Sequence, residues 1–403
     1  MRYLTPELLR LLSQKRKMAF IAGPRQVGKT TLVRHLLERA GQSGNYFNWD
    51  IESHRKAILR QPEGFWTTAP AARPRIALDE IHKYPRWKRF LKGLYDAAGA
   101  QTDILVTGSG RLDIYQRGGD SLLGRYGLYR LHPFTLAEML APDRACLLEP
   151  QELWRRVREA EPPSGAQAAL GQMELLTGFP EPLFSGSESR LRRWRRARRQ
   201  LVLREDLRDL TRIRDIGLVE ALAALLPERV GSPLSLNALS EDLGVAFGSV
   251  RTLVEALGRL YYLFEVRPYA GRLARTLRRE AKVYLFDFSE IPDPGARFEN
   301  LAALHLIKLR DAWNDRGLGD YELHYVRDKE KHEVDFLLTE SHRPYLLLET
   351  KLSAGPTSPS LLYFRERLKP VYAVQLSRAQ PARAQADARG VLHLGAARFL
   401  SLL

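Results

Sequence analysis

The first 141 residues alternate short apolar runs with segments of helical period. Four of the runs have the length and composition of buried strands. The segment 31–37, directly after the first loop, spaces its apolar residues as one face of a helix does. The predicted strands are 18–21, 76–80, 103–107 and 125–131. Strands that alternate with helices in this way predict an α/β fold with a parallel sheet.

Further along the chain the pattern changes twice. Residues 188–211 keep a helical period throughout and predict one long helix. Residues 235–245 and 247–260 then predict two helices joined by a glycine-containing turn, and an apolar hairpin-like strand follows at 261–269. This order is typical of a winged helix. Its second helix either enters a DNA groove or acts as a scaffold, and its polar residues are only mildly suited to base readout.

The loop after the first strand matches the pattern G-x-x-x-x-G-K-[ST]. Gly23 and Gly28 let backbone N–H groups turn inward around a phosphate, Lys29 reaches the β and γ oxygens, and Thr30 presents a hydroxyl to Mg²⁺. The helix that follows points its N-terminus at the same anion. The predicted cofactor-binding residues are Gly23, Pro24, Arg25, Gln26, Val27, Gly28, Lys29, Thr30 and Thr31.

Two acids end the second apolar strand, about 50 residues after this loop. At the tip of a buried strand beside a phosphate loop, Asp79 is expected to hold the Mg²⁺ shell together with Thr30. Glu80 is then expected to orient and deprotonate the attacking water. Thr107 or Ser109, at the end of the third strand, is expected to contact the γ-phosphate or that water. No Asn-Lys-x-Asp motif is present, which disfavours GTP and leaves ATP and Mg²⁺ as the predicted cofactors.

Composition narrows the class of protein. The chain has 403 residues, of which 44% are hydrophobic, so it can bury a large core divided among two or three domains. The single cysteine, Cys146, excludes an intrachain disulfide and a cysteine-rich zinc site, as is usual in a reducing cytoplasm. We expect a cytoplasmic protein without a membrane span, because no stretch approaches about 18 apolar residues.

The net charge of +16 favours polyanionic partners, with nucleic acid first. The charge is concentrated at 190–199, which reads RLRRWRRARR. On a helix these guanidinium groups surround Trp194 and predict a surface that contacts DNA phosphates. A solvated helix face and a subunit interface remain the alternatives for the same ten residues.

A second constellation lies near the C-terminus. Asp335 sits on one apolar strand (332–338), and Glu349 and Lys351 follow on the next, where their spacing of two places them on the same face. Two carboxylates beside an ammonium are typical of a metal nuclease, in which Asp335 and Glu349 hold Mg²⁺ and Lys351 orients water or stabilises the phosphorane. Glu299, on the preceding helix, is expected to complete the metal shell. A cross-strand surface pair is the alternative.

On the basis of these motifs, nearly the whole chain resembles a group of bacterial and archaeal proteins. In that group an AAA+ ATPase is joined to a C-terminal domain of unknown function with a restriction-endonuclease-like core. His82 stands where that family usually has glutamine, and no proline precedes Asp335, so the chain matches only the loose form of the PD-(D/E)xK nuclease signature. The resemblance implies a DNA-directed ATPase that assembles as a ring, with Arg117 or Arg125 as the arginine finger. The segments that carry the resemblance are 23–31, 78–85, 107–109, 204–210, 298–300 and 333–336.

The predicted fold class is therefore α/β, with a P-loop AAA+ domain, a winged-helix-like region and a restriction-endonuclease-like domain. The expected domains are the ATPase core (1–141), a helical lid with the basic helix (142–230), the winged-helix-like domain (231–280) and the nuclease-like domain (281–403). We predict an ATPase that acts on DNA by remodelling, translocation or metal-dependent cleavage, as a homo-oligomer. The alternative is an ATP-driven switch whose nuclease-like domain is catalytically silent.

Overall fold

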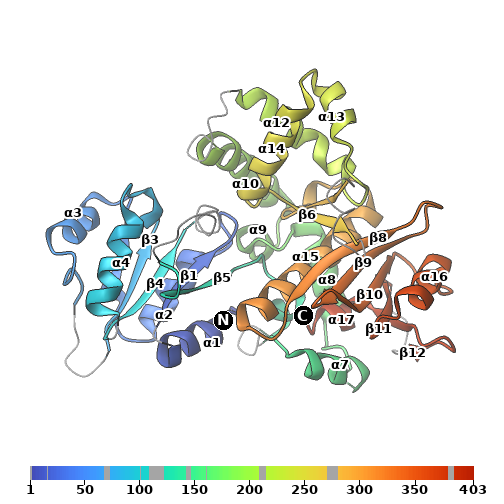
Figure 1. The fold of residues 1–403 in the computed structure, drawn as a ribbon, viewed down its shortest axis with the longest axis horizontal. Coiled ribbons are helices and arrows are strands. Elements are labelled where there is room, and N and C mark those ends of the chain that lie inside the picture. Colours follow the sequence, from blue (N-terminus) through green and yellow to red (C-terminus); the bar gives the residue numbers. More distant parts are fainter. Residues whose placement is uncertain are drawn as a thin grey trace. The chain divides into compact units, whose positions relative to one another are not determined.

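The chain folds into two compact units, one up to His132 and the other from Pro133 onward (Figure 1). The structure is a computed structural model. It describes residues 2–15, 17–67, 73–99, 101–108, 122–141, 147–159, 161–207, 215–269, 280–379 and 385–403. The predicted α/β class is confirmed, because the first unit has a parallel sheet with helices and the second a mixed sheet with helices.

The first unit is built on a five-stranded parallel sheet in the order β2-β3-β4-β1-β5. Its strands are β1 (Met18–Ala22), β2 (Tyr46–Asn48), β3 (Arg75–Asp79), β4 (Asp103–Thr107) and β5 (Tyr126–Arg130). Every residue of β1 and β4 is buried, as in sheets covered on both faces. Because β4 lies between β3 and β1, the loops after these three strands leave from one edge, as the sequence predicts.

Helices of the first unit pack apolar stripes against this sheet. In α4, Trp87, Leu91 and Leu94 recur at helical spacing and are buried in the same core as Phe20 and Val106. The helices are α1 (Thr5–Arg10), continued by a π-helical turn (Leu11–Lys15), α2 (Lys29–Glu38), α3 (Glu52–Arg60) and α4 (Trp87–Ala98), with 3-10 turns at Ser43–Asn45 and Ile81–Lys83. The helix predicted after the phosphate loop is α2.

The second unit contains an eight-stranded mixed sheet in the order β12-β13-β11-β10-β9-β8-β6-β7. Neighbouring strands β8, β9 and β10 are antiparallel, whereas β10, β11 and β13 are parallel. The strands are β6 (Leu263–Pro268), β7 (Lys282–Leu285), β8 (Tyr321–Arg327), β9 (Glu333–Glu340), β10 (Arg343–Lys351), β11 (Tyr372–Ser377), β12 (Gln385–Ala386) and β13 (Leu392–Gly395). The two strands predicted around Asp335 and Glu349 are β9 and β10.

The long helix α15 (Pro294–Arg316) packs against strands of this sheet. Asp293 caps its N-terminus by accepting from the backbone N–H of Ala296, and Pro294 fits the first turn, where no N–H is needed. Asn300 is fully buried, and its side-chain amide accepts from the backbone N–H of Leu285 and donates to the Leu285 carbonyl. Two bonds to one residue of β7 fix the helix in register with the sheet.

The other helices of the second unit are α6 (Leu136–Leu140), α7 (Pro150–Glu159), α8 (Ala166–Leu176), α9 (Pro180–Ser185), α10 (Glu188–Gln200), α12 (Ile216–Leu225), α13 (Leu236–Leu243), α14 (Phe247–Arg259), α16 (Pro359–Leu368) and α17 (Ala396–Leu400). Short turns lie at Leu226–Arg229 and Phe288–Glu290. The predicted long helix is α10, prolonged by a π-helical segment at Leu201–Asp206. Among the described helices, none is both long and apolar enough to cross a membrane.

The two helices of the expected winged-helix region are present as α13 and α14. The strand that follows them, β6, pairs antiparallel with β7 and parallel with β8, so it belongs to the eight-stranded sheet. The winged-helix identity and the divisions at residues 141, 230 and 280 stay predictions.

Gly23 has φ +145°, a backbone conformation that residues with a side chain rarely adopt. A Cβ atom at this position would lie 2.2 Å from the carbonyl oxygen of Leu131. We predict that Gly23→Ala destabilises the first unit by at least about 1–3 kcal/mol, the usual cost of a strained backbone. Urea unfolding monitored by circular dichroism measures this. Gly93→Ala is the matched control, because its Cβ meets open space in α4. A Gly23→Ala protein that unfolds at the parent's urea concentration would contradict the prediction.

Candidate nucleotide site and acidic cluster

The phosphate loop connects the buried strand β1 to the first turn of α2. Gly28 (φ +101°) and Gln26 (φ 61°) both adopt left-handed backbone conformations in this turn. The Lys29 side chain is buried and folds back over the loop, where its ammonium donates to the carbonyl oxygens of Gly23 at 2.8 Å and Pro24 at 2.7 Å. The lysine charge therefore lies at the mouth of the loop, beside the N-terminus of α2.

Asp79, at the end of β3, is the polar centre of the site. It is 3% exposed, and its carboxylate accepts hydrogen bonds from three hydroxyl groups. Thr30 donates to Oδ2 at 2.7 Å, Tyr46 donates to the same oxygen at 2.6 Å, and Thr107 donates to Oδ1. The structure thus brings Thr30 and Asp79, both predicted as metal ligands, within hydrogen-bond distance of each other. A hydroxyl and a fixed carboxylate beside a phosphate loop suit Mg²⁺, which prefers oxygen ligands.

Glu80 follows Asp79 directly and has a left-handed backbone conformation (φ 56°). Its Oε2 atom is buried, lies 3.4 Å from Nε2 of His82 and 3.9 Å from Nζ of Lys83, and accepts no hydrogen bond within the described residues. Burial raises the pKa of the Glu80 carboxyl above its usual value, and the charge of Arg25 partly opposes this. A carboxylate with a raised pKa is a better proton acceptor, as a general base requires. His82, which stands where the family usually has glutamine, thus lies beside the Glu80 carboxylate.

Two residues that sequence patterns did not indicate also build this site. The guanidinium of Arg2 donates to the carbonyl oxygens of Val27 and His132, which ties the loop to the end of β5. Tyr46, on β2, holds Asp79, and the guanidinium of Arg34 lies 3.9 Å from the centre of its ring. These contacts join segments far apart in the chain.

The remaining predicted residues of the first unit lie in different surroundings. Thr31 is exposed on the first turn of α2. Arg125 precedes β5, and the register of β5 with β1 places it at the sheet edge opposite the phosphate loop, where it pairs with Asp96 at 2.8 Å. Its role as a finger offered to a neighbouring subunit stays a prediction. Ser109 and Arg117 lie outside the described residues.

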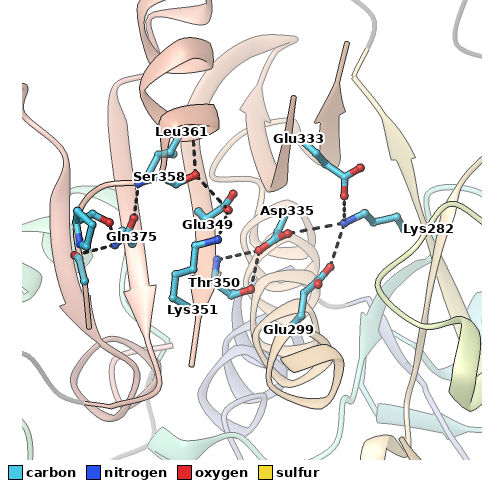
Figure 2. A network of polar contacts seen from close by, with 12 residues as sticks. Lys282, Glu299, Glu333, Asp335, Glu349, Thr350, Lys351, Ser358, Leu361 and Gln375 are labelled. Atoms are coloured by element: carbon cyan, nitrogen blue, oxygen red, sulfur yellow. Dashed lines mark hydrogen bonds and ion pairs between the residues drawn. The ribbon is translucent and has the colours of Figure 1, made fainter. Parts of the chain in front are cut away.

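The predicted acidic residues of the second unit come together at the β9–β10 pair and α15 (Figure 2). Leu348 pairs with Phe336, so the register places Glu349 opposite Asp335. Asp335 Oδ2 accepts from the backbone N–H of Thr350 at 2.8 Å and from its hydroxyl at 2.6 Å. The ammonium of Lys351 donates to Glu349 Oε1 at 2.7 Å, as expected for two residues on one strand face.

An unpredicted residue, Lys282 on β7, occupies the middle of this cluster. Its side chain is 1% exposed. Its ammonium lies 2.7 Å from Oε1 of Glu333, 3.2 Å from Oε1 of Glu299 and 3.7 Å from Oδ1 of Asp335. Tyr284, two residues along β7, also donates to Glu299 Oε1, at 2.6 Å. Glu299 and Asp335 are thus linked through a buried lysine.

The cluster is electrostatically crowded. Burial and the negative charge of Asp335 raise the pKa of Glu299 to about 8 and that of Glu349 to about 7. Lys282 opposes both shifts. Burial lowers the pKa of Lys282 itself, but the surrounding carboxylates outweigh this effect and raise it. Four acids gathered in one partly buried place therefore need compensating cations or protons.

The arginine run on α10 divides into two faces. Arg198 is buried over the ring of Phe179, while Arg195 and Arg199 form ion pairs with Glu290 at 3.3 and 2.6 Å. This face fixes the helix to the turn Phe288–Glu290. The exposed arginines are Arg190, Arg192, Arg193 and Arg196. This second face presents its guanidinium groups to solvent, where a large partner can reach them.

Comparison with protein families divides the chain into three matched segments. Residues 15–140 match the model of an AAA domain. Residues 168–289 and 294–388 match two domains of unknown function (DUF8612 and DUF4143). The first match includes the phosphate loop, Asp79 and Glu80, and the third includes Glu299, Asp335, Glu349 and Lys351.

Two curated relatives are 24% identical to the chain over 345 residues, which is 84% of this chain and 71% of theirs. They are the uncharacterized proteins Mb2031c of Mycobacterium bovis and Rv2008c of Mycobacterium tuberculosis. Among solved structures, an Aeropyrum pernix ORC1 protein in complex with DNA aligns with 75% of this chain and 93% of its own, at 16% identity and a TM-score of 0.32. A Pif1 helicase from Bacteroides aligns with 43% and 49%, at 14% identity and a TM-score of 0.22.

Scores this low do not establish a shared fold. The match to the AAA domain covers residues 15–140. In the structure, this segment brings the phosphate loop, Asp79 and Glu80 together. The N-terminal part of the chain is therefore similar to an AAA domain.

Proposed function

We propose that the chain binds Mg²⁺-ATP and hydrolyses it at the edge of the first unit's sheet. The observation that carries this proposal is the convergence of Lys29 and Thr30, in the first turn of α2, with Asp79 and Glu80 at the end of β3. Lys29 and the N-terminus of α2 would hold the phosphates, and Thr30 and Asp79 would hold the metal. When bound, Mg²⁺-ATP supplies the γ-phosphoryl group and the cation that neutralises its charge.

In this proposal Glu80 acts as the general base and His82 as its positioning residue. Glu80 directly follows Asp79 and would take the proton of a water beside the metal ligands, and burial raises its pKa, which makes it a better proton acceptor. The His82 imidazole borders the buried oxygen of Glu80 at 3.4 Å. The left-handed backbone at Glu80 costs about 1–3 kcal/mol and is a feature typical of functional sites.

We further propose that ATP turnover serves an action on DNA. Its support is the +16 net charge together with the exposed arginine face of α10, Arg190, Arg192, Arg193 and Arg196. The action on DNA is remodelling, translocation or metal-dependent cleavage, and cleavage would take place at the acidic residues of the second unit. A switch with a silent C-terminal domain is the second candidate, and the buried ammonium of Lys282 favours it. Assembly as a homo-oligomer with Arg125 as its finger belongs to the same proposal.

The first test separates nucleotide binding from hydrolysis. Lys29→Ala removes the ammonium at the mouth of the loop, so we expect both ATP affinity and turnover to collapse. Glu80→Gln keeps size and polarity but cannot take a proton, so binding should persist while turnover falls by about 100-fold or more. Filter binding and phosphate release measure the two quantities. Parent-like turnover in Glu80→Gln would rule out Glu80 as the base.

The second test concerns His82. If this side chain positions Glu80, His82→Ala should lower kcat about 10-fold or more while leaving KM and ATP affinity near the parent values. His82→Gln can still present a hydrogen-bond donor and should recover most of the rate. His35→Ala, an exposed histidine on α2, is the control. Equal losses in the Ala and Gln variants, or a loss expressed only in KM, would count against a positioning role.

The third test compares two sets of arginines of equal charge. Changing Arg192, Arg193 and Arg196 to Gln should flatten the dependence of log affinity for duplex DNA on log salt, by about 0.9 for each phosphate that the variant no longer neutralises. Changing Arg155, Arg156 and Arg158 on α7, which are also exposed, alters net charge equally and should leave that slope unchanged. Fluorescence anisotropy at several salt concentrations gives both slopes. The same slope for the two variants would assign the α10 face to solvent.

A further inference from the structure

The carboxylates of the second unit already have a cation among them. The ammonium of Lys282 lies within 3.7 Å of an oxygen of Glu299, Glu333 and Asp335, and the side chain is almost completely buried (Figure 2). A charge is stable in such a place only when opposite charges or hydrogen bonds compensate its lost hydration. Lys282 and these three acids therefore compensate one another.

Both oxygens of Asp335 and one oxygen of Glu349 are already engaged by other groups. Asp335 Oδ1 faces Lys282, and Asp335 Oδ2 accepts two hydrogen bonds from Thr350. Glu349 Oε1 accepts from Lys351 at 2.7 Å and from the Ser358 hydroxyl at 3.4 Å. Glu349 Oε2 is buried without a hydrogen-bond partner in the described part of the chain. Among the oxygens of Glu299, Asp335 and Glu349, the two Oε2 atoms of the glutamates are those without a partner in the described residues. A metal held by Asp335 would therefore have to displace the Lys282 ammonium or the hydrogen bonds from Thr350.

Charge points the same way. Beside Lys282 and Lys351, the guanidinium of Arg327 lies 3.4 Å from Oε2 of Glu333, so three cations already accompany the four carboxylates. A divalent ion bound by Glu299 and Asp335 together would lie against the Lys282 ammonium. The Lys282 side chain is only 1% exposed, so burial holds its charge at this place. The residues present thus do not fit a metal shared by these two acids.

We propose that Lys282 is the resident cation of this cluster and takes the place of a divalent metal. The second unit then keeps the acids of a metal nuclease but uses them to hold α15, β7 and β9 together, and it does not cleave DNA. This inference rests on the proposed function and, of its two candidates, supports the one in which the C-terminal domain is catalytically silent. It does not depend on ATP hydrolysis, which is measured separately at the first unit.

The deciding experiment is a Mn²⁺ titration of the full chain without nucleotide, followed by electron paramagnetic resonance. The parent protein is compared with Asp335→Asn, which keeps the shape of the side chain and removes its charge. We expect the two proteins to bind the same number of Mn²⁺ ions, because any ion at Asp79 is common to both. One Mn²⁺ more in the parent, or Asp335-dependent cleavage of plasmid DNA by the parent in Mn²⁺, would overturn the proposal.

A second variant tests the place of Lys282 directly. Lys282→Ala removes the ammonium and should gain one Mn²⁺, and this gain should be absent from the Lys282→Ala/Asp335→Asn double variant. Lys308→Ala, which removes another buried lysine of the same unit outside the cluster, should gain none. A folded Lys282→Ala protein without the additional Mn²⁺ would also overturn the proposal. If Lys282→Ala does not fold, the comparison of the parent with Asp335→Asn still decides.

Discussion

The nucleotide site depends on how the Asp79 carboxylate is held. Thr30 from α2, Tyr46 from β2 and Thr107 from β4 all donate to it, so one side chain joins three elements around the phosphate loop. Hydrogen bonds to a charged acceptor contribute about 1.5–3 kcal/mol each, which offsets the cost of burying the carboxylate. The same bonds fix the direction of its oxygens before any ligand arrives, and a fixed direction is what metal and phosphate binding require.

The two units treat buried acids differently. In the first, the Asp79 carboxylate accepts hydrogen bonds from three neutral hydroxyl groups. In the second, Lys282 sits directly among the carboxylates at 2.7–3.7 Å. Removal of one partner from a buried ion cluster costs about 3–5 kcal/mol, so such a cluster resists rearrangement. We therefore propose that the first arrangement binds a cation and that the second is structural.

Sequence patterns predicted the parts of the fold that local physics determines. The strand Asp103–Thr107 was predicted to the residue, because three apolar residues form its centre and a glycine follows it. The phosphate loop and the two acids after β3 were found because their chemistry requires a fixed spacing. The α10 helix was likewise evident from its period, although the period does not tell which arginines Glu290 binds.

The residues that were missed act over long separations. Arg2 contacts His132, 130 positions away, and Lys282 reaches Asp335 on a strand that is not adjacent in the sheet. No sequence motif surrounds either residue. A lone arginine or lysine normally lies in solvent, so neither residue was expected to be buried. The register of β9 with β10 showed that Asp335 and Glu349 meet, whereas the cation between Asp335 and Glu299 became evident only from the folded structure.

The central claim of the proposed function is that the phosphate loop, Asp79 and Glu80 hydrolyse ATP in the service of an action on DNA. The most direct measurement is the rate of phosphate release from Mg²⁺-ATP by the purified full chain, with and without duplex DNA, at low salt. We predict measurable turnover that DNA increases and that chelation of Mg²⁺ abolishes. Absence of turnover under both conditions, or turnover that persists in chelator, would contradict this function.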